Sequence, residues 1–359
     1  MNNCGLYIHI PFCKSKCPYC DFYSGYGEKE EIDRYIKAAA RQIREEKRLW
    51  GSVFFGGGTP SLLNKENWEE LMYAIGETSL SAEMTTEVNP GDVSEDYLKM
   101  LKEVGINRLS IGAQSLKDKL LLFLGRRHTA KDIHLAVDAA KKAGFENISL
   151  DFMLGLPNQT QEDIKAAVNF LKEHKISHAS AYILKVEEGT PFFKNGIADL
   201  LDEDDICEKY LLFCSEIEKV GFSQYEISNF SLSGKESKHN LKYWKSEPYL
   251  GIGPGAHSFL NGKRFFIEPN RKAYIEKIEA GISPFTGFED GGDFKEYAML
   301  RLRLKEGLDL KTAGEREKDI RKKASVYIKA GLMEIEENRL RFTRTGFLLS
   351  NTIISNLIF

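Results

Sequence analysis

Three cysteines are spaced closely enough to hold a single inorganic cofactor. Cys13, Cys17 and Cys20 follow the pattern C-x3-C-x2-C, after an apolar run that begins near Tyr7. A 4Fe-4S cluster normally takes four thiolates, so three would leave the fourth iron open to a small molecule. A zinc site would need a fourth Cys or His, and a disulfide would leave one of the three thiols unpaired. The spacing therefore favours an iron–sulfur cluster over zinc, a disulfide or inert buried thiols.

A glycine-rich turn follows the next apolar segment. Residues 54–55 are both Phe, and Gly56, Gly57, Gly58 and Thr59 come directly after them. Without side chains, the backbone can approach a ligand closely and direct its N–H and C=O groups at it. Taken alone, the triplet is explained equally well as a tight turn between a strand and a helix. The cysteine motif that precedes it favours a ligand-binding turn.

Further polar residues end predicted strands. Glu87, Gln114 and Asp151 each stand at or just after the last residues of an apolar run. In proteins built on parallel strands, ligands gather at the C-terminal ends of those strands. We therefore expect these side chains to bind a ligand, although polar residues in such places can also be ordinary solvated loop residues.

The elements that must position these residues alternate regularly along the chain. Apolar residues at helical spacing, such as Ile133, Ala136, Val137 and Ala140, alternate with short apolar runs. Strands are predicted at 53–55, 83–88, 107–111, 147–153 and 177–183, with helices at 32–49, 65–79, 94–104, 130–143 and 161–173. This order implies parallel strands with helical crossovers in an α/β fold.

Glycines mark the ends of several predicted helices. Gly105, Gly144, Gly221 and Gly331 each follow a helical stripe and precede the first apolar residue of the next strand. Glycine adopts the left-handed conformation of a helix C-cap without a steric penalty. The recurrence supports the same alternation of helices and strands.

Length and composition narrow the class of protein. At 359 residues the chain is long enough for a large core domain with a smaller one appended. Its net charge of −3 lacks the basic character of a nucleic-acid binder, so we expect no DNA or RNA partner. The first strand begins near Met1, which leaves no room for a secretory signal. No run of about 18 apolar residues occurs, so no membrane-spanning helix is expected. Three of the six cysteines share one loop, which fits a metal site in a reducing compartment better than a disulfide framework. These features predict a soluble, cytoplasmic protein.

The cysteine motif, followed two residues later by the aromatic Phe22, resembles the signature of the radical S-adenosylmethionine (SAM) superfamily. The resemblance implies that Cys13, Cys17 and Cys20 ligate a 4Fe-4S cluster whose fourth iron binds SAM. An electron from such a cluster cleaves SAM to methionine and a 5′-deoxyadenosyl radical. Arg126 could pair with the SAM carboxylate, and Asp151 could accept hydrogen bonds from ribose hydroxyls. The SAM contacts that the resemblance implies are Tyr7, Tyr19, Gly57, Gly58, Thr59, Glu87, Gln114, Arg126 and Asp151.

Two features refine the branch within the oxygen-independent coproporphyrinogen III oxidase-like proteins. The oxidases carry a further cysteine where this chain has Phe22, and residues 239–244, His-Asn-Leu-Lys-Tyr-Trp, match the H-N-x-x-Y-W signature of the HemW heme chaperones. The resemblance implies heme as a ligand, with His239 as a candidate iron ligand. A lone His in an aromatic segment is also commonly a hydrogen-bonded structural residue.

The partners that this resemblance implies are heme and a heme-acceptor protein, which a membrane-bound cytochrome would satisfy. An electron donor is needed if SAM is cleaved, and a homodimer is a further expectation. The alternative is a radical enzyme that decarboxylates coproporphyrinogen III or acts on another tetrapyrrole, against which Phe22 and residues 239–244 argue. A winged-helix regulator would need a basic recognition helix, whereas the charges of residues 315–323 are mixed in sign.

The resemblance also predicts the domain organisation. Residues 1–224 are expected to form a partial (β/α)6 radical SAM barrel. Residues 225–290 read as a connecting and cover segment that carries the H-N-x-x-Y-W motif. Residues 291–359 are predicted to form a smaller, winged-helix-like α+β domain at the C-terminus.

Overall fold

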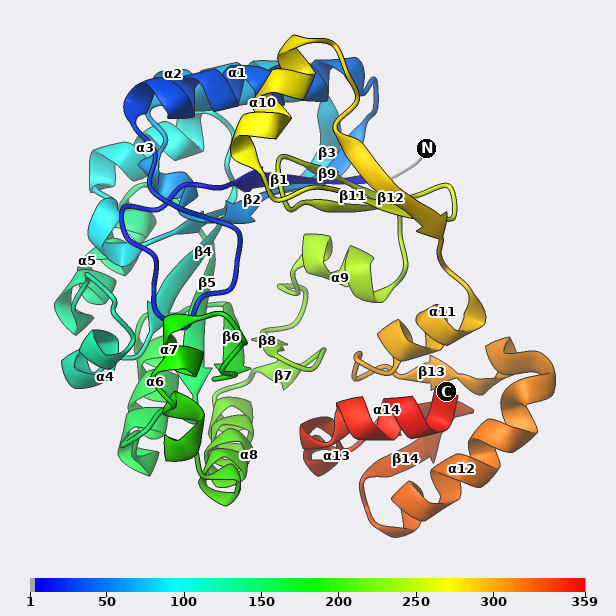
Figure 1. Cartoon of the computed structure of the whole chain (residues 1–359). Helices are drawn as coiled ribbons and strands as arrows, with labels where there is room; N and C mark the ends of the chain where they lie inside the picture. The colour runs from blue at the N-terminus through cyan, green and yellow to red at the C-terminus, as the bar shows by residue number, and fades with distance from the viewer. Residues whose placement is uncertain (1–3, 359) are drawn as a thin grey trace.

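A curved sheet of parallel strands forms the centre of the molecule. The computed structural model describes residues 4–358, whose larger sheet has twelve strands in the order β12-β11-β10-β9-β1-β2-β3-β4-β5-β6-β8-β7 (Figure 1). The strands β1 to β6 are adjacent, parallel and in chain order. Their bounds are β1 (Cys4–Ile10), β2 (Trp50–Gly57), β3 (Thr78–Val88), β4 (Arg108–Gln114), β5 (Asn147–Leu154) and β6 (His178–Ile183). The predicted partial (β/α)6 barrel is confirmed.

Helices connect these strands or follow the last of them, and the longer helices each bury an apolar stripe. They are α1 (Lys29–Glu45), α2 (Lys65–Ile75), α3 (Glu95–Glu103), α4 (Asp118–Phe123), α5 (Ala130–Lys142), α6 (Gln161–Glu173), α7 (Pro191–Lys194) and α8 (Glu203–Lys219). The buried stripe of α5 consists of the four apolar residues expected from the sequence, Ile133, Ala136, Val137 and Ala140. Burying such a stripe against the sheet is the main source of stability for an amphipathic helix.

Two helix ends differ from the prediction because strands begin earlier than expected. The helix predicted to reach position 49 ends at Glu45, and the buried Trp50 already belongs to β2. The helix predicted to reach position 79 ends at Ile75, where Gly76 follows with a φ of 64°. By contrast, the four recurrent glycines do cap helices, since all have positive φ: 104° at Gly105, 84° at Gly144, 93° at Gly221 and 71° at Gly331.

The segment after the barrel extends the same sheet rather than only lying over it. Residues 225–290 contain α9 (Lys238–Trp244), β9 (Tyr249–Ile252), β10 (His257–Leu260), β11 (Lys263–Ile267), α10 (Arg271–Glu279) and β12 (Phe285–Asp290). Strand β9 pairs in parallel with β1, and β10 to β12 continue the sheet as antiparallel neighbours. At the opposite edge, β8 (Asn229–Ser231) and β7 (Ser223–Gln224) follow β6.

Helix α9 lies against the inner face of the barrel. The backbone N–H groups of Lys238 and His239 donate to the carboxylate of Glu83 on β3 at 3.1 and 3.0 Å. Alternation along β3 places Glu83 on the same face as Glu87. The segment that matches H-N-x-x-Y-W therefore shares the barrel interior with the predicted ligand-binding residues.

The C-terminal part has its own hydrophobic core. It contains α11 (Phe294–Arg301), α12 (Glu317–Lys329), α13 (Arg344–Leu348), α14 (Ser350–Ile358) and the antiparallel strands β13 (Leu308–Asp309), β15 (Arg339–Phe342) and β14 (Met333–Glu336). Its buried apolar residues lie between Ala298 and Leu357 and form a separate cluster. The smaller α+β domain is therefore confirmed. Within residues 4–358, no helix has the length and apolar character needed to cross a membrane.

Candidate functional site

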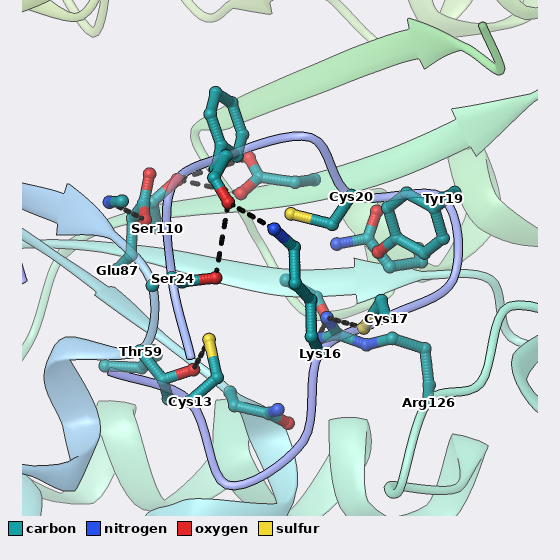
Figure 2. Close-up of a pocket in the computed structure, with 18 of the residues that line it drawn as sticks. Cys13, Lys16, Cys17, Tyr19, Cys20, Ser24, Thr59, Glu87, Ser110 and Arg126 are labelled. Atoms are coloured by element: carbon teal, nitrogen blue, oxygen red, sulfur yellow. Dashed lines mark hydrogen bonds between the residues drawn. The ribbon is translucent and has the colours of Figure 1, made fainter. Parts of the chain in front are cut away.

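A cavity of about 360 Å³ lies at the carboxyl ends of the parallel strands. The loop between β1 and α1, residues 11–28 (the cysteine loop), forms one wall of it (Figure 2). The predicted site residues that line this cavity are Cys13, Cys17, Tyr19, Cys20, Gly57, Gly58, Thr59, Glu87, Gln114, Arg126 and Asp151. Residues separated by more than one hundred positions in the chain are thus brought to one place.

The three cysteines of the motif face the same space. Figure 2 shows their sulfur atoms on the inner side of the cysteine loop. Thr59 Oγ1 donates to Cys13 Sγ at 3.4 Å, and Arg126 Nη1 donates to Cys17 Sγ at 3.7 Å. A hydroxyl and a guanidinium thus donate hydrogen bonds to two of the three sulfur atoms, and sulfur is the atom through which cysteine binds metals.

The three thiols are ligands of the type that holds an iron–sulfur cluster. Among residues 4–358, no group of three or more His, Cys, Asp or Glu side chains is placed to hold one metal ion. A 4Fe-4S cluster binds each thiolate through a different iron and so accepts more widely spaced sulfurs. The three thiols, their two donors and the open volume beside them fit such a cluster.

The glycine turn after β2 is packed against the cysteine loop. Gly58 N–H donates to Ile10 C=O at 2.9 Å, and Thr59 N–H donates to Phe12 C=O at 2.8 Å. A Cβ atom added at Gly58 would lie 2.5 Å from the carbonyl oxygen of Phe12. Gly57 has a φ of 104°, and a Cβ there would meet the ring of His9 at 2.3 Å. Gly58 is therefore required by the close approach of two backbone segments, and Gly57 by its positive φ and by the ring of His9.

Two carboxyl groups share the inner wall of the cavity. Burial, with a further contribution from the charge of Asp151, raises the pKa of Glu87 to about 8. Glu87 Oε2 also accepts the N–H of Gly57 at 3.1 Å. Burial likewise raises the pKa of Asp151, although hydrogen bonds from neighbouring serine hydroxyls, including Ser110 at 3.0 Å, oppose the shift. These groups can bind an amine and the hydroxyls of a ligand.

Arg126 supplies a buried positive charge in the wall of the site. Its Nη2 donates to Gly112 C=O at 2.9 Å, while its buried Nε has no hydrogen-bond partner. An unsatisfied buried N–H is costly, so a ligand that offers an acceptor there would be favoured. Together with the carboxyl groups, this arginine could hold a zwitterionic amino acid such as the methionine part of SAM.

Tyr7 and His239 are the predicted site residues that do not line the cavity within residues 4–358. The hydroxyl of Tyr7 pairs with His9 Nδ1 at 3.0 Å, and its ring stacks on Phe54 at 6.2 Å. Its position on β1 beside the cysteine loop is as expected. In this structure it supports His9, which packs against Gly57.

His239 is fully buried on α9 and both of its ring nitrogens are paired. Nδ1 lies 2.9 Å from Ser52 Oγ, and Nε2 lies 2.8 Å from the hydroxyl of Tyr243. Burial lowers the pKa of His239 to about 3, so the ring is neutral. To ligate heme iron, the imidazole would have to break at least one of these bonds. This geometry favours the structural role that the sequence left open.

We therefore expect His239→Ala to lower stability without removing a heme ligand. The change leaves Ser52 and Tyr243 without their partner and opens a cavity, at a cost of about 3 kcal/mol. Chemical denaturation measures the loss, and the Soret band of heme added to the folded variant measures ligation. A bleached or shifted Soret band at unchanged stability would instead support ligation by His239.

Several lining residues were missed by sequence reasoning. They are Ser15, Lys16, Phe22, Ser24, Pro60, Val88, Asn89, Ser110, Gly112, Met153 and Tyr182. Ser110 and Gly112 could have been found, because strand alternation places them on the same face as Gln114. Nothing in the sequence predicts that Lys16 Nζ turns back to donate to Phe22 C=O at 2.9 Å.

Comparisons with known families agree with this architecture. The sequence profile of the radical SAM superfamily matches residues 7–171, and that of the HemN C-terminal domain matches residues 294–349. The first match contains the cysteine loop, the glycine turn and the strand ends that carry Glu87, Gln114 and Asp151. The second covers most of the C-terminal core.

Curated relatives extend over nearly the whole chain. The heme chaperone HemW of Bacillus subtilis (strain 168) is 36% identical, with 97% of each chain covered. HemW of Mycobacterium tuberculosis (strain ATCC 25618 / H37Rv) is 31% identical over 99% of this chain and 94% of its own. Among solved structures, coproporphyrinogen III oxidase (HemN) from Escherichia coli has a TM-score of 0.81 at 20% identity, covering 99% of this chain and 90% of that one. At that identity the structural likeness establishes the fold alone.

Proposed function

Because the chain belongs to the HemW family, within the radical SAM superfamily, we propose that it is a heme chaperone that binds a 4Fe-4S cluster and SAM. The observation that carries the proposal is the cavity in which three thiols, a glycine turn, two carboxyl groups and an arginine meet. In this assignment Cys13, Cys17 and Cys20 hold the cluster. When bound, the cluster would supply an open iron for SAM and an electron for its cleavage.

Different residues of the cavity would bind different parts of SAM. Gly57, Gly58 and Thr59 offer backbone groups at the side of the cysteine loop, and Glu87 is placed to accept from an amine. Arg126 is positioned for the carboxylate through its unpaired Nε. Asp151 accepts hydrogen bonds from the ribose hydroxyls. Gln114 and Tyr19 line the rest of the cavity around SAM. Tyr7 would act through His9, from behind the turn.

Heme binding is proposed from family membership, since the curated relatives are named heme chaperones. Phe22 supports it. This residue lines the mouth of the cavity with 63% of its surface exposed, and an exposed aromatic ring can stack on a porphyrin. A thiol at this position would offer no such surface. His239 remains a predicted iron ligand that the buried geometry of α9 does not favour.

Transfer of heme to an acceptor protein in the cytoplasm completes the proposal. A membrane-bound acceptor, an electron donor for SAM cleavage and a homodimer remain predictions, as does the expectation of no nucleic-acid partner. Coproporphyrinogen oxidase activity is not expected. The alternative, a radical enzyme that acts on coproporphyrinogen III or another tetrapyrrole, is tested by the following experiment.

We expect the reconstituted protein to retain heme and to leave coproporphyrinogen III unchanged. The protein is reconstituted anaerobically with iron and sulfide, then given SAM, a reductant, and either heme or coproporphyrinogen III. Gel filtration with absorbance detection follows retained heme, and chromatography of the tetrapyrrole follows decarboxylation. Decarboxylated product without stable heme binding would replace the chaperone by the enzyme alternative.

A further inference from the structure

A buried line of hydrogen bonds leads from the cavity to the start of α9. Asp151 Oδ1 accepts from Ser149 Oγ at 3.4 Å, and Ser149 Oγ lies 2.7 Å from His178 Nδ1. His178 Nε2 lies 2.8 Å from the hydroxyl of Tyr225. That hydroxyl in turn accepts the backbone N–H of Ser237, the N-cap of α9, at 3.2 Å. The line thus joins strands β5 and β6 to the helix of residues 238–244.

The two ends of this line fix the direction of every bond in it. Asp151 Oδ1 accepts from Ser149 Oγ, and the backbone N–H of Ser237 can only donate. Ser149 therefore gives its proton to Asp151 and accepts from His178 Nδ1–H. The remaining nitrogen, Nε2, must then accept the hydroxyl proton of Tyr225. One tautomer of His178, protonated at Nδ1, satisfies all four bonds.

The surroundings keep the line intact. Ser149 and His178 are both buried, at 0% and 1% exposure. Burial lowers the pKa of His178 well below its usual value, as does the nearby charge of Arg108, so the imidazole stays neutral. Water has little access to replace a bond in this line, which makes each missing partner costly.

We propose that Ser149, His178 and Tyr225 are positioning residues that orient the Asp151 carboxylate for a ligand hydroxyl and tie that orientation to the N-terminus of α9. The inference rests on the proposed binding of SAM in the cavity. It adds that the binding site extends, through four hydrogen bonds, to the helix whose sequence matches H-N-x-x-Y-W. Ligand binding at either end would then affect the other, because such coupling is reciprocal.

Breaking one hydrogen bond of this line should weaken SAM binding only in part. Ser110 Oγ also donates to the Asp151 carboxylate, at 3.0 and 3.2 Å. This second donor holds the group when Ser149 or Tyr225 is altered. We therefore expect weaker SAM binding, by a factor of about 3–10 on the usual worth of one hydrogen bond, and not its loss.

The test compares Tyr225→Phe and Ser149→Ala with the control Tyr274→Phe. Tyr274 is also buried and donates from its hydroxyl to Gln42 Oε1 at 2.6 Å, but it lies on α10 and does not line the cavity. Titration calorimetry of SAM into each reconstituted protein should show weaker binding in the first two variants alone. In an Asp151→Asn background, Tyr225→Phe should have little further effect, since the two residues act through one path.

Two outcomes would overturn the inference. One is a Tyr225→Phe protein that loses thermal stability as Tyr274→Phe does but binds SAM like the wild type. The other comes from nitrogen NMR of the wild type without cofactors, if His178 is protonated at Nε2. Failure of the proposed function is seen separately, as a wild-type protein that holds the cluster but binds no SAM.

Discussion

Replacing Cys17 by Ala should abolish the brown absorbance of the reconstituted protein, and SAM binding should be lost with it. The variant keeps only two of the three thiols that line the cavity. The remaining cysteines cannot substitute, because Cys4 is buried on β1 outside the cavity, and Cys207 and Cys214 lie on α8. A cluster with two protein ligands has no stable anchorage.

The matched control is Cys207→Ala, which removes a half-buried thiol of α8. Its iron and sulfide content after anaerobic reconstitution should equal that of the wild type. Circular dichroism of both variants checks that the barrel has folded. A normal 4Fe-4S absorption spectrum in Cys17→Ala would refute the assignment of the three cysteines.

The second large effect is expected from adding one methyl group at Gly58. In Gly58→Ala the new Cβ would lie 2.5 and 2.6 Å from the carbonyl oxygens of Phe12 and Ile10. Both neighbours are backbone atoms, so the cysteine loop itself must move. Overpacking of this kind costs about 3 kcal/mol, and the displaced loop also carries Cys13. We expect poor cluster incorporation together with a lower melting temperature.

Gly25→Ala provides the comparison within the same loop. Its added Cβ would meet only the end of Arg271, at 4.0 Å, which is an ordinary contact. This variant should take up the cluster normally and melt near the wild-type temperature. If Gly58→Ala did the same, the close packing of the glycine turn on the cysteine loop would have no role in the site.

The sequence predicts much of the site because its signals are local. The spacing of Cys13, Cys17 and Cys20 lies within one loop, and Glu87 and Asp151 were located by where their strands end. Parallel strands then bring such ends together whatever the details of packing. That Gly58 allows two backbone segments to approach closely, and that Gly57 packs against the ring of His9, became visible only in three dimensions.

What could not be predicted depends on contacts between distant parts of the chain. Strands β9 to β12 pair with one another and with β1, but their residues show no clean alternation, since β9 is buried on both faces. The pairing of His239 with Ser52, and the line from Ser149 to Ser237, join residues far apart in sequence. The periodicity of apolar residues within one segment does not indicate such distant partners.

The position of β1 inside the sheet has a consequence for how the protein is made. Leu6 pairs with Val53 on one side and with Leu250 on the other. A ribosome adding about 5–20 residues per second needs roughly 10–40 s to pass from the first partner to the second. During that interval the nascent barrel carries an unpaired apolar edge next to its cysteines, a state prone to aggregation. Production arrested before residue 249 should therefore yield insoluble chains, even though every cysteine of the motif has been synthesised.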